Sequence, residues 1–358
     1  MGLVADSQSA SAPRIAPRPR VGSAEGQDAR ARTRPLRPLS ERVLECLPGL
    51  RVAWIAVWAL VPWVNAGAHL LLGTKQTSEA LWEQSSLLIV LNYAAVSFAV
   101  VITLEGTRRI AGRMEALRAT TPNVLTWDAS PPFRGVNSVA GPLLVTIAAS
   151  VAFGTSTLIR DGWTPALLRG VTWLIIGIAL GTFLWTYACL QLGLHRLGRE
   201  RLVSDAVHVD PGLGLHALGR LASTGLWLLL VWLIPLLLTA LPDLAGAVIG
   251  LLVLAAALGM FFFSLQRLHW QMVEVKAGEL AIARELYTKA YEPVHETRTL
   301  EALEQRHTLL SAADALEKRA SAIHEWPIDD GTLAQVITIA TTVIAMMIGR
   351  LILHPLGL

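Results

Sequence analysis

Apolar residues are gathered along this chain into long runs that short polar segments separate. Seven of these runs are long enough to cross a hydrocarbon layer about 30 Å thick as helices of about 20 residues. They cover Val52–Leu72, Ser86–Leu104, Gly141–Leu158, Val171–Gly193, Gly225–Leu241, Ala245–Leu265 and Leu333–Leu353. Such runs exclude a β-barrel, whose strands are short and alternate in polarity. The pattern therefore predicts an all-α, polytopic membrane protein with seven transmembrane helices.

Arginine is concentrated in every second connection between the predicted spans. The tail and the connections after the second and fourth spans contain Arg30, Arg32, Arg34, Arg37, Arg42, Arg108, Arg109, Arg113, Arg118, Arg134, Arg196, Arg199, Arg201 and Arg220. The connection after the first span has only Lys75, and the turn between the fifth and sixth spans has no basic residue. The positive-inside rule then places the N-terminus in the cytoplasm and the C-terminus outside the cell membrane. The basic loops are expected to meet anionic lipid headgroups at the cytoplasmic face.

Residues 267–328, between the sixth and seventh spans, are predicted to form a cytoplasmic helical hairpin. No helix breaker occurs between the sixth span and Pro293, so one helix is expected to continue out of the membrane. A second helical pattern follows and stops before Pro327, with Trp326 suited to the membrane interface. Asp329 or Asp330 can cap the last span. This hairpin is the expected docking surface for a cytoplasmic protein partner.

Composition supports a membrane protein and separates the N-terminal tail from the rest. Hydrophobic residues make up 53% of the chain and charged residues only 16%, with a mean hydropathy of +0.50. Residues 1–47 are instead rich in Arg, Pro and Ala, and we expect them to be a disordered cytoplasmic tail. The predicted division is therefore residues 1–47 as the tail, 48–266 as a six-helix membrane domain, 267–328 as the hairpin and 329–358 as the seventh transmembrane helix.

The last apolar run has one side of small and hydroxyl-bearing residues. On a helical wheel this side contains Thr338, Thr341, Thr342, Ala345 and Gly349, and Arg350 follows at its outer end. We call these six residues the threonine stripe. Such a stripe can pack closely against another helix, or it can border a water-filled path in a symmetric oligomer. A plain lipid anchor would have no need of it.

Two further groups of residues in the spans are candidates for a role. Asn65 and His69 lie one turn apart near the outer end of the first span and predict either polar packing or an outer polar pocket for a small ligand. Close helix packing is predicted at two pairs of glycines with small-xxx-small spacing, which are Gly177, Gly181, Gly246 and Gly250.

Neither a catalytic motif nor a cofactor motif occurs in the chain. A metal site is conceivable among His195, Asp205, His208, Asp210 and His216, but their spacing matches no established ligand pattern. The spans lack a central Asp, Glu or Lys, which argues against an ion-coupled transporter. The arginines of the tail have no interleaved aromatic residues, which argues against nucleic-acid binding. We therefore expect no enzyme activity, no cofactor and no metal.

The predicted layout resembles the seven-helix ion channels of the insect chemoreceptor type. The likeness is one of arrangement: an inward N-terminus, a cytoplasmic extension of the sixth span and an outward final helix. In that family the cytoplasmic helices form the main tetramer contact and the last helix lines the pore. The resemblance implies a homo-oligomeric channel or channel-like receptor and transfers no functional residue, since the family's Thr-Tyr motif does not occur between Leu333 and Leu353. The alternative is a nonconducting scaffold or signalling subunit.

Overall fold

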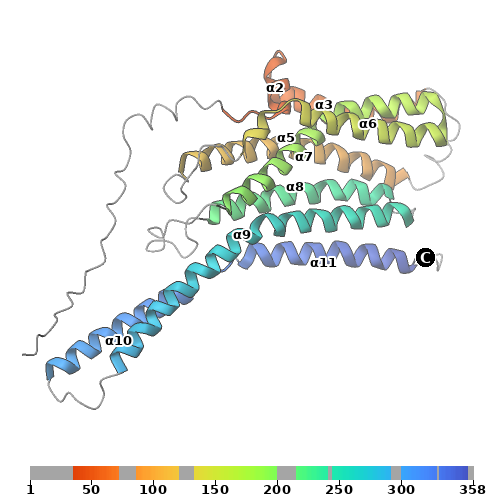
Figure 1. The fold of residues 1–358 in the computed structure, drawn as a ribbon. Helices are drawn as coiled ribbons and strands as arrows, with labels where there is room; N and C mark the ends of the chain where they lie inside the picture. The colour runs from red at the N-terminus through yellow and green to blue at the C-terminus, as the bar shows by residue number, and fades with distance from the viewer. Residues whose placement is uncertain are drawn as a thin grey trace, which may run out of the picture. The chain divides into compact units, whose positions relative to one another are not determined.

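Helices account for all the regular structure in the described part of the chain. The computed structural model describes residues 35–71, 86–120, 133–199, 215–240, 244–291, 300–328 and 330–353. Its helices are α2 (Leu39–Cys46), α3 (Arg51–Leu71), α5 (Ser86–Thr120), α6 (Ala140–Asp161), α7 (Trp163–Leu197), α8 (His216–Ala240), α9 (Leu244–Tyr291), α10 (Leu300–Ser321) and α11 (Asp330–Leu353), with a 3-10 turn at Arg134–Asn137 (Figure 1). The prediction of an all-α fold is confirmed over these ranges.

Five helices in the described part are long and apolar enough to cross a membrane. These stretches are Arg51–His69, Val90–Leu117, Ala140–Ile159, Trp163–Leu197 and His216–Leu233. They overlap the first five predicted spans and are compatible with an integral membrane protein. The predicted sixth and seventh spans fall in α9 and α11, which are not among the five. The total of seven and the direction of insertion stay predictions.

The predicted tail gives way to ordered structure before residue 47. Leu39–Cys46 forms α2, and the side chains of Ser40 and Leu44 are buried. Arg51 at the start of α3 holds this helix in place, because its guanidinium pairs with Glu41 at 2.7 Å and with Glu105 of α5 at 3.1 Å. Composition alone does not reveal that α2 is held against α3 and α5, since α2 has few apolar residues. Residues 1–34 lie outside the described ranges.

A single residue joins α6 to α7. Gly162 has a φ of 88°, a left-handed conformation that glycine adopts without steric cost. Its backbone N–H donates to the Leu158 carbonyl, which ends α6, and α7 begins at the next residue. Pro165 falls in the first turn of α7, where a missing N–H removes no helical hydrogen bond. The connection predicted between the third and fourth spans is therefore almost entirely helical.

The core of the bundle is built around α7. This helix packs against α2, α3, α5, α6, α8 and α9. One side of it buries Phe183, Tyr187, Leu190 and Leu194, which recur at three- and four-residue spacing. On the other side of the bundle, α5 and α8 are linked by the Trp232 indole, which donates to the Thr103 hydroxyl at 2.6 Å.

The long helix α9 is continuous, as the absence of a breaker before Pro293 predicted. It runs from Leu244 to Tyr291, and α10 lies along its second half (Figure 1). One polar pair links α9 to α10, and a second links α9 to the turn that follows α10. Lys276 Nζ lies 3.1 Å from Glu325 Oε1, and Tyr287 shares a hydrogen bond with Glu317. Partial burial and then this carboxylate raise the pKa of Tyr287 above its ordinary value.

Small side chains form the seam of this hairpin. Ala283 and Ala290 of α9 and Ala313 and Ala320 of α10 are at most 3% exposed. Each pair is spaced by seven residues, so its members lie on one side of their helix. The pair of Tyr287 with Glu317 sets a register in which Ala283 lies near the level of Ala320 and Ala290 near the level of Ala313. The two backbones can therefore approach more closely than larger side chains would allow.

Replacing Ala313 with leucine is expected to loosen the hairpin. The added atoms have no room in the seam, and overpacking of this kind costs about 1–2 kcal/mol. Hydrogen exchange should show faster opening of the α10 amides, because local opening reports local stability. Ala312 is the matched control, since the neighbouring side chain is exposed and Ala312→Leu adds the same atoms outside the seam. Equal exchange in the two variants would contradict the alanine seam.

Candidate functional site

The threonines and the alanine of the threonine stripe lie on the side of α11 that faces away from the described helices. Thr338, Thr341, Thr342 and Ala345 are exposed, and the other side of α11 buries Val336 and Ala340. The main contact of α11 among the described helices is with α9. For the remaining members of the stripe, the surroundings of Gly349 and the side chain of Arg350 are not described. The four described members of the stripe are thus free of close packing against the described part of one copy of the chain.

The stripe hydroxyls are satisfied by the helix that carries them. Thr338 donates to the Ala334 carbonyl at 2.8 Å, and Thr342 donates to the Thr338 carbonyl at 2.7 Å. Thr341 donates to the carbonyls of Ile337 and Thr338 at 2.7 and 2.9 Å. Each hydroxyl oxygen can still accept hydrogen bonds, because its lone pairs are not used within the helix. A neighbouring helix, or water, could donate these hydrogen bonds.

The predicted outer polar pair belongs to α3, which packs against α5 and α7. Trp63 of α3 stands 5.8 Å from Tyr93, centroid to centroid, and donates to Ser97 Oγ at 3.0 Å. Asn65 Oδ1 is buried and has no hydrogen-bond partner in the described part of the chain. His69 is 9% exposed, one turn further along α3. These facts suit polar packing or an outer pocket equally.

Gly177 and Gly181 allow α6 and α7 to approach closely. A Cβ on Gly177 would lie 3.0 Å from Thr146 Cγ2, and a Cβ on Gly181 would lie 2.7 Å from the Pro142 carbonyl oxygen. The Thr146 hydroxyl crosses this contact and lies 2.7 Å from the Gly177 carbonyl oxygen, to which it donates. For the other predicted pair, Gly246 and Gly250 in α9, the surroundings lie outside the described residues.

The histidines and acids considered for a metal do not converge in the described part of the chain. His195 stacks on Phe263 with a centroid distance of 4.8 Å, and His216 lies edge-on to His324 at 5.5 Å. No group of three or more His, Cys, Asp or Glu side chains is arranged to hold a metal ion in the ranges that the structure covers. The remaining candidates, Asp205, His208 and Asp210, fall outside those ranges.

A buried polar cluster between α7 and α9 was not predicted. Tyr187 and Gln191 of α7 and Ser264 of α9 are each at most 2% exposed. The Ser264 hydroxyl donates to the Gln191 side-chain oxygen, and Gln191 Nε2 has no partner in the described part. Sequence spacing shows that Tyr187 and Gln191 share a face of α7, but not that Ser264 meets them. The cluster joins the helix at the centre of the bundle to the one that forms the hairpin.

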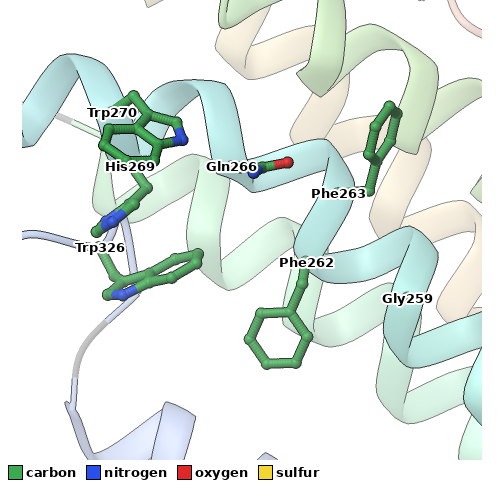
Figure 2. Close-up of a pocket in the computed structure, with 7 residues that line it drawn as sticks. All are labelled: Gly259, Phe262, Phe263, Gln266, His269, Trp270 and Trp326. Atoms are coloured by element: carbon green, nitrogen blue, oxygen red, sulfur yellow. The ribbon is translucent and has the colours of Figure 1, made fainter.

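An aromatic groove lies where α9 leaves the bundle. It has a volume of about 480 Å³ (Figure 2). We call it the aromatic groove, and it is lined by Gly259, Phe262, Phe263, Gln266, His269, Trp270 and Trp326. Trp326 comes from the turn between α10 and α11. Its ring stacks on His269 at 4.2 Å and meets Phe262 edge-on at 5.9 Å. The sequence predicted an interfacial role for Trp326 but not its partners.

Two helices, α9 and α8, hold the turn that carries Trp326. His269 Nδ1 donates to the Glu325 carbonyl oxygen at 2.8 Å, which requires the proton on Nδ1. Gly219 of α8 packs against Pro327 so tightly that an added Cβ would lie 2.7 Å from the Pro327 carbonyl carbon. At the end of α7, the Gly198 carbonyl accepts from Gln271 Nε2 of α9 at 2.9 Å. The base of the hairpin is therefore packed against the bundle.

Comparison with known proteins adds no assignment. No protein-family model matches the chain, and neither the curated proteins nor the solved structures contain a match.

Proposed function

We propose that the protein is a subunit of a homo-oligomeric ion channel in the cell membrane. In this proposal the chain has seven spans, with α9 and α11 as the sixth and seventh, and the N-terminus is cytoplasmic. The threonine stripes of neighbouring copies surround a central water-filled path. The cytoplasmic α9–α10 hairpin contributes contacts between copies and responds to a cytoplasmic partner.

The exposed position of the threonine stripe carries this proposal. A helix that only anchors the chain in lipid presents large apolar side chains outward, but α11 presents three hydroxyls and an alanine beside the exposed Ile337 and Ile348. Neutral hydroxyls are suitable for the wall of a channel, because they can replace part of the hydration shell of an ion. The low charge content of the spans agrees with passive conduction rather than with ion-coupled transport.

The test is modification of a cysteine placed in the stripe. Thr342→Cys in a Cys46→Ser background leaves buried Cys189 as the other thiol. A charged thiol reagent reacts with a thiolate in water and not with a thiol in lipid. We expect the reagent, added outside to protein in planar bilayers, to modify Cys at position 342 and to block most of the current.

Ile337→Cys is the matched control for this experiment. Ile337 is 50% exposed but lies outside the stripe on the same helix. We expect no reaction and unchanged current there. Absence of current in every condition, with a monomeric mass in detergent, would reject the channel.

A second candidate function is that of a nonconducting scaffold, favoured by exposed apolar residues near the tip of the hairpin. Ile282, Tyr291, Leu300 and Leu303 are 50–74% exposed. Such residues are typical of a surface that binds another protein. A liposome flux assay distinguishes the two functions. A scaffold gives no ion flux, and the thiol reagent has no effect on the Thr342→Cys variant. A channel gives flux that the reagent blocks in this variant.

A further inference from the structure

We propose that the aromatic groove binds one anionic phospholipid from the cytoplasmic leaflet, with an acyl chain beside Gly259 and Phe262 and the headgroup near Gln266 and His269. This site is independent of conduction and of the threonine stripe. The position of the groove along α9, the charges beside it and the shape of its walls each support this occupant.

The groove spans the change from apolar to charged sequence. The stretch of α9 from Leu244 to Gln266 has no charged residue, and Arg267 is the first. The groove begins at Gly259 and ends at Trp270, a length of about 16 Å along a helix. That length covers the end of the acyl region and the headgroup layer, so a molecule in the groove meets an apolar part and a polar part in the same order as a phospholipid.

Basic side chains lie on the side of the groove that Phe263 lines. His195 stacks on Phe263, and Arg199 and Arg267 lie close enough to His195 to interact with it electrostatically. Both arginines are exposed. Glu325 of the turn is paired with Lys276 at 3.1 Å. The excess of positive charge favours an anionic headgroup over a zwitterionic one.

The walls of the groove are aromatic and still uncovered. Phe263 and Trp270 are 60% and 61% exposed, whereas Trp326 is held by its stack on His269 (Figure 2). Trp and His at the membrane interface place an apolar ring against acyl chains and a polar edge among headgroups. A volume of about 480 Å³ lies in the usual range of ligand sites. It is large enough for one acyl chain.

Filling the groove from Gly259 tests the proposal. A Cβ on Gly259 meets no atom within 4 Å, so Gly259→Leu places its side chain in the groove without disturbing the backbone. Gly278 is the matched control, because it is a glycine of the same helix whose added Cβ also meets nothing within 4 Å. Native mass spectrometry of the full chain in detergent, titrated with phosphatidylglycerol or phosphatidylcholine, measures the lipid bound.

We expect the wild type and Gly278→Leu to retain one phosphatidylglycerol in preference to phosphatidylcholine, and Gly259→Leu to lose that adduct. Arg267→Gln should lower the preference for phosphatidylglycerol about fivefold, since one basic residue near anionic lipid contributes about 1 kcal/mol. Retention of the adduct by Gly259→Leu, or equal binding of the two lipids by the wild type, would overturn the proposal. The proposal would also be overturned if the wild type were a dimer and Gly259→Leu were a monomer, because the groove would then be occupied by a second copy of the chain.

Discussion

Gly219→Ala is expected to lower the unfolding free energy by about 3 kcal/mol, at the upper end of the usual range for overpacking. The new methyl group would collide with the backbone of Pro327, and no side-chain rotation can relieve such a contact. The start of α8 and the turn before α11 would have to separate. That movement would also disturb Trp326 and the stack that it makes on His269.

Thermal unfolding of the purified protein in detergent measures this effect. Gly112→Ala in α5 is the matched control, because its added Cβ meets no atom within 4 Å and alanine is the better helix former. We expect the control to match or exceed the wild type in Tm. A Gly219→Ala variant with the stability of the control would show that α8 does not pack against Pro327 as described.

Gly181→Ala is expected to lower the unfolding free energy by about 2 kcal/mol, because it forces α6 away from α7. The Cβ would meet the Pro142 carbonyl oxygen at 2.7 Å and the hydroxyl of Thr146. Separation of the helices would also weaken the hydrogen bond from Thr146 to the Gly177 carbonyl. Interhelical hydrogen bonds of this kind contribute about 0.6–2 kcal/mol in membranes.

The control for this variant lies on the same helix. Gly170 of α7 has no atom within 4 Å of an added Cβ, so Gly170→Ala should not lower the Tm. Adding Thr146→Ala to Gly181→Ala should recover part of the loss, since the side-chain contact is removed while the contact with Pro142 remains. If Gly170→Ala and Gly181→Ala unfold at the same temperature, the close approach of α6 and α7 at this point is wrong.

The sequence predicted those parts of the fold that depend on local patterns. Long apolar runs predicted the positions of the five helices that are long and apolar enough to cross a membrane, and the absence of a breaker before Pro293 predicted the continuity of α9. The junction at Gly162 was predicted as a longer connection. A glycine that ends one helix, followed by Pro165 within the first turn of the next, is the signal that favours so short a turn.

The sites that depend on contacts between helices could not be predicted in the same way. Ser264 and Gln191 are 73 residues apart, and nothing in either helical pattern shows that they meet. The aromatic groove likewise needs Trp326 to fold back onto His269. Periodicity along one helix identifies a face, but only the packing shows what that face contacts. The threonine stripe illustrates the same limit, because its face was predicted, whereas its exposure among the described helices was not.

The continuity of α9 gives the hairpin a mechanical property. From Trp270 to Tyr291 the helix extends for about 32 Å, so a tilt of about 10° at the base moves its far end by about 5–6 Å. An unbroken helix transmits such a rotation without loss at a joint, and α10 stiffens it along the alanine seam. A force applied to the tip of the hairpin is therefore delivered as torque at the aromatic groove and at the turn from which α11 starts.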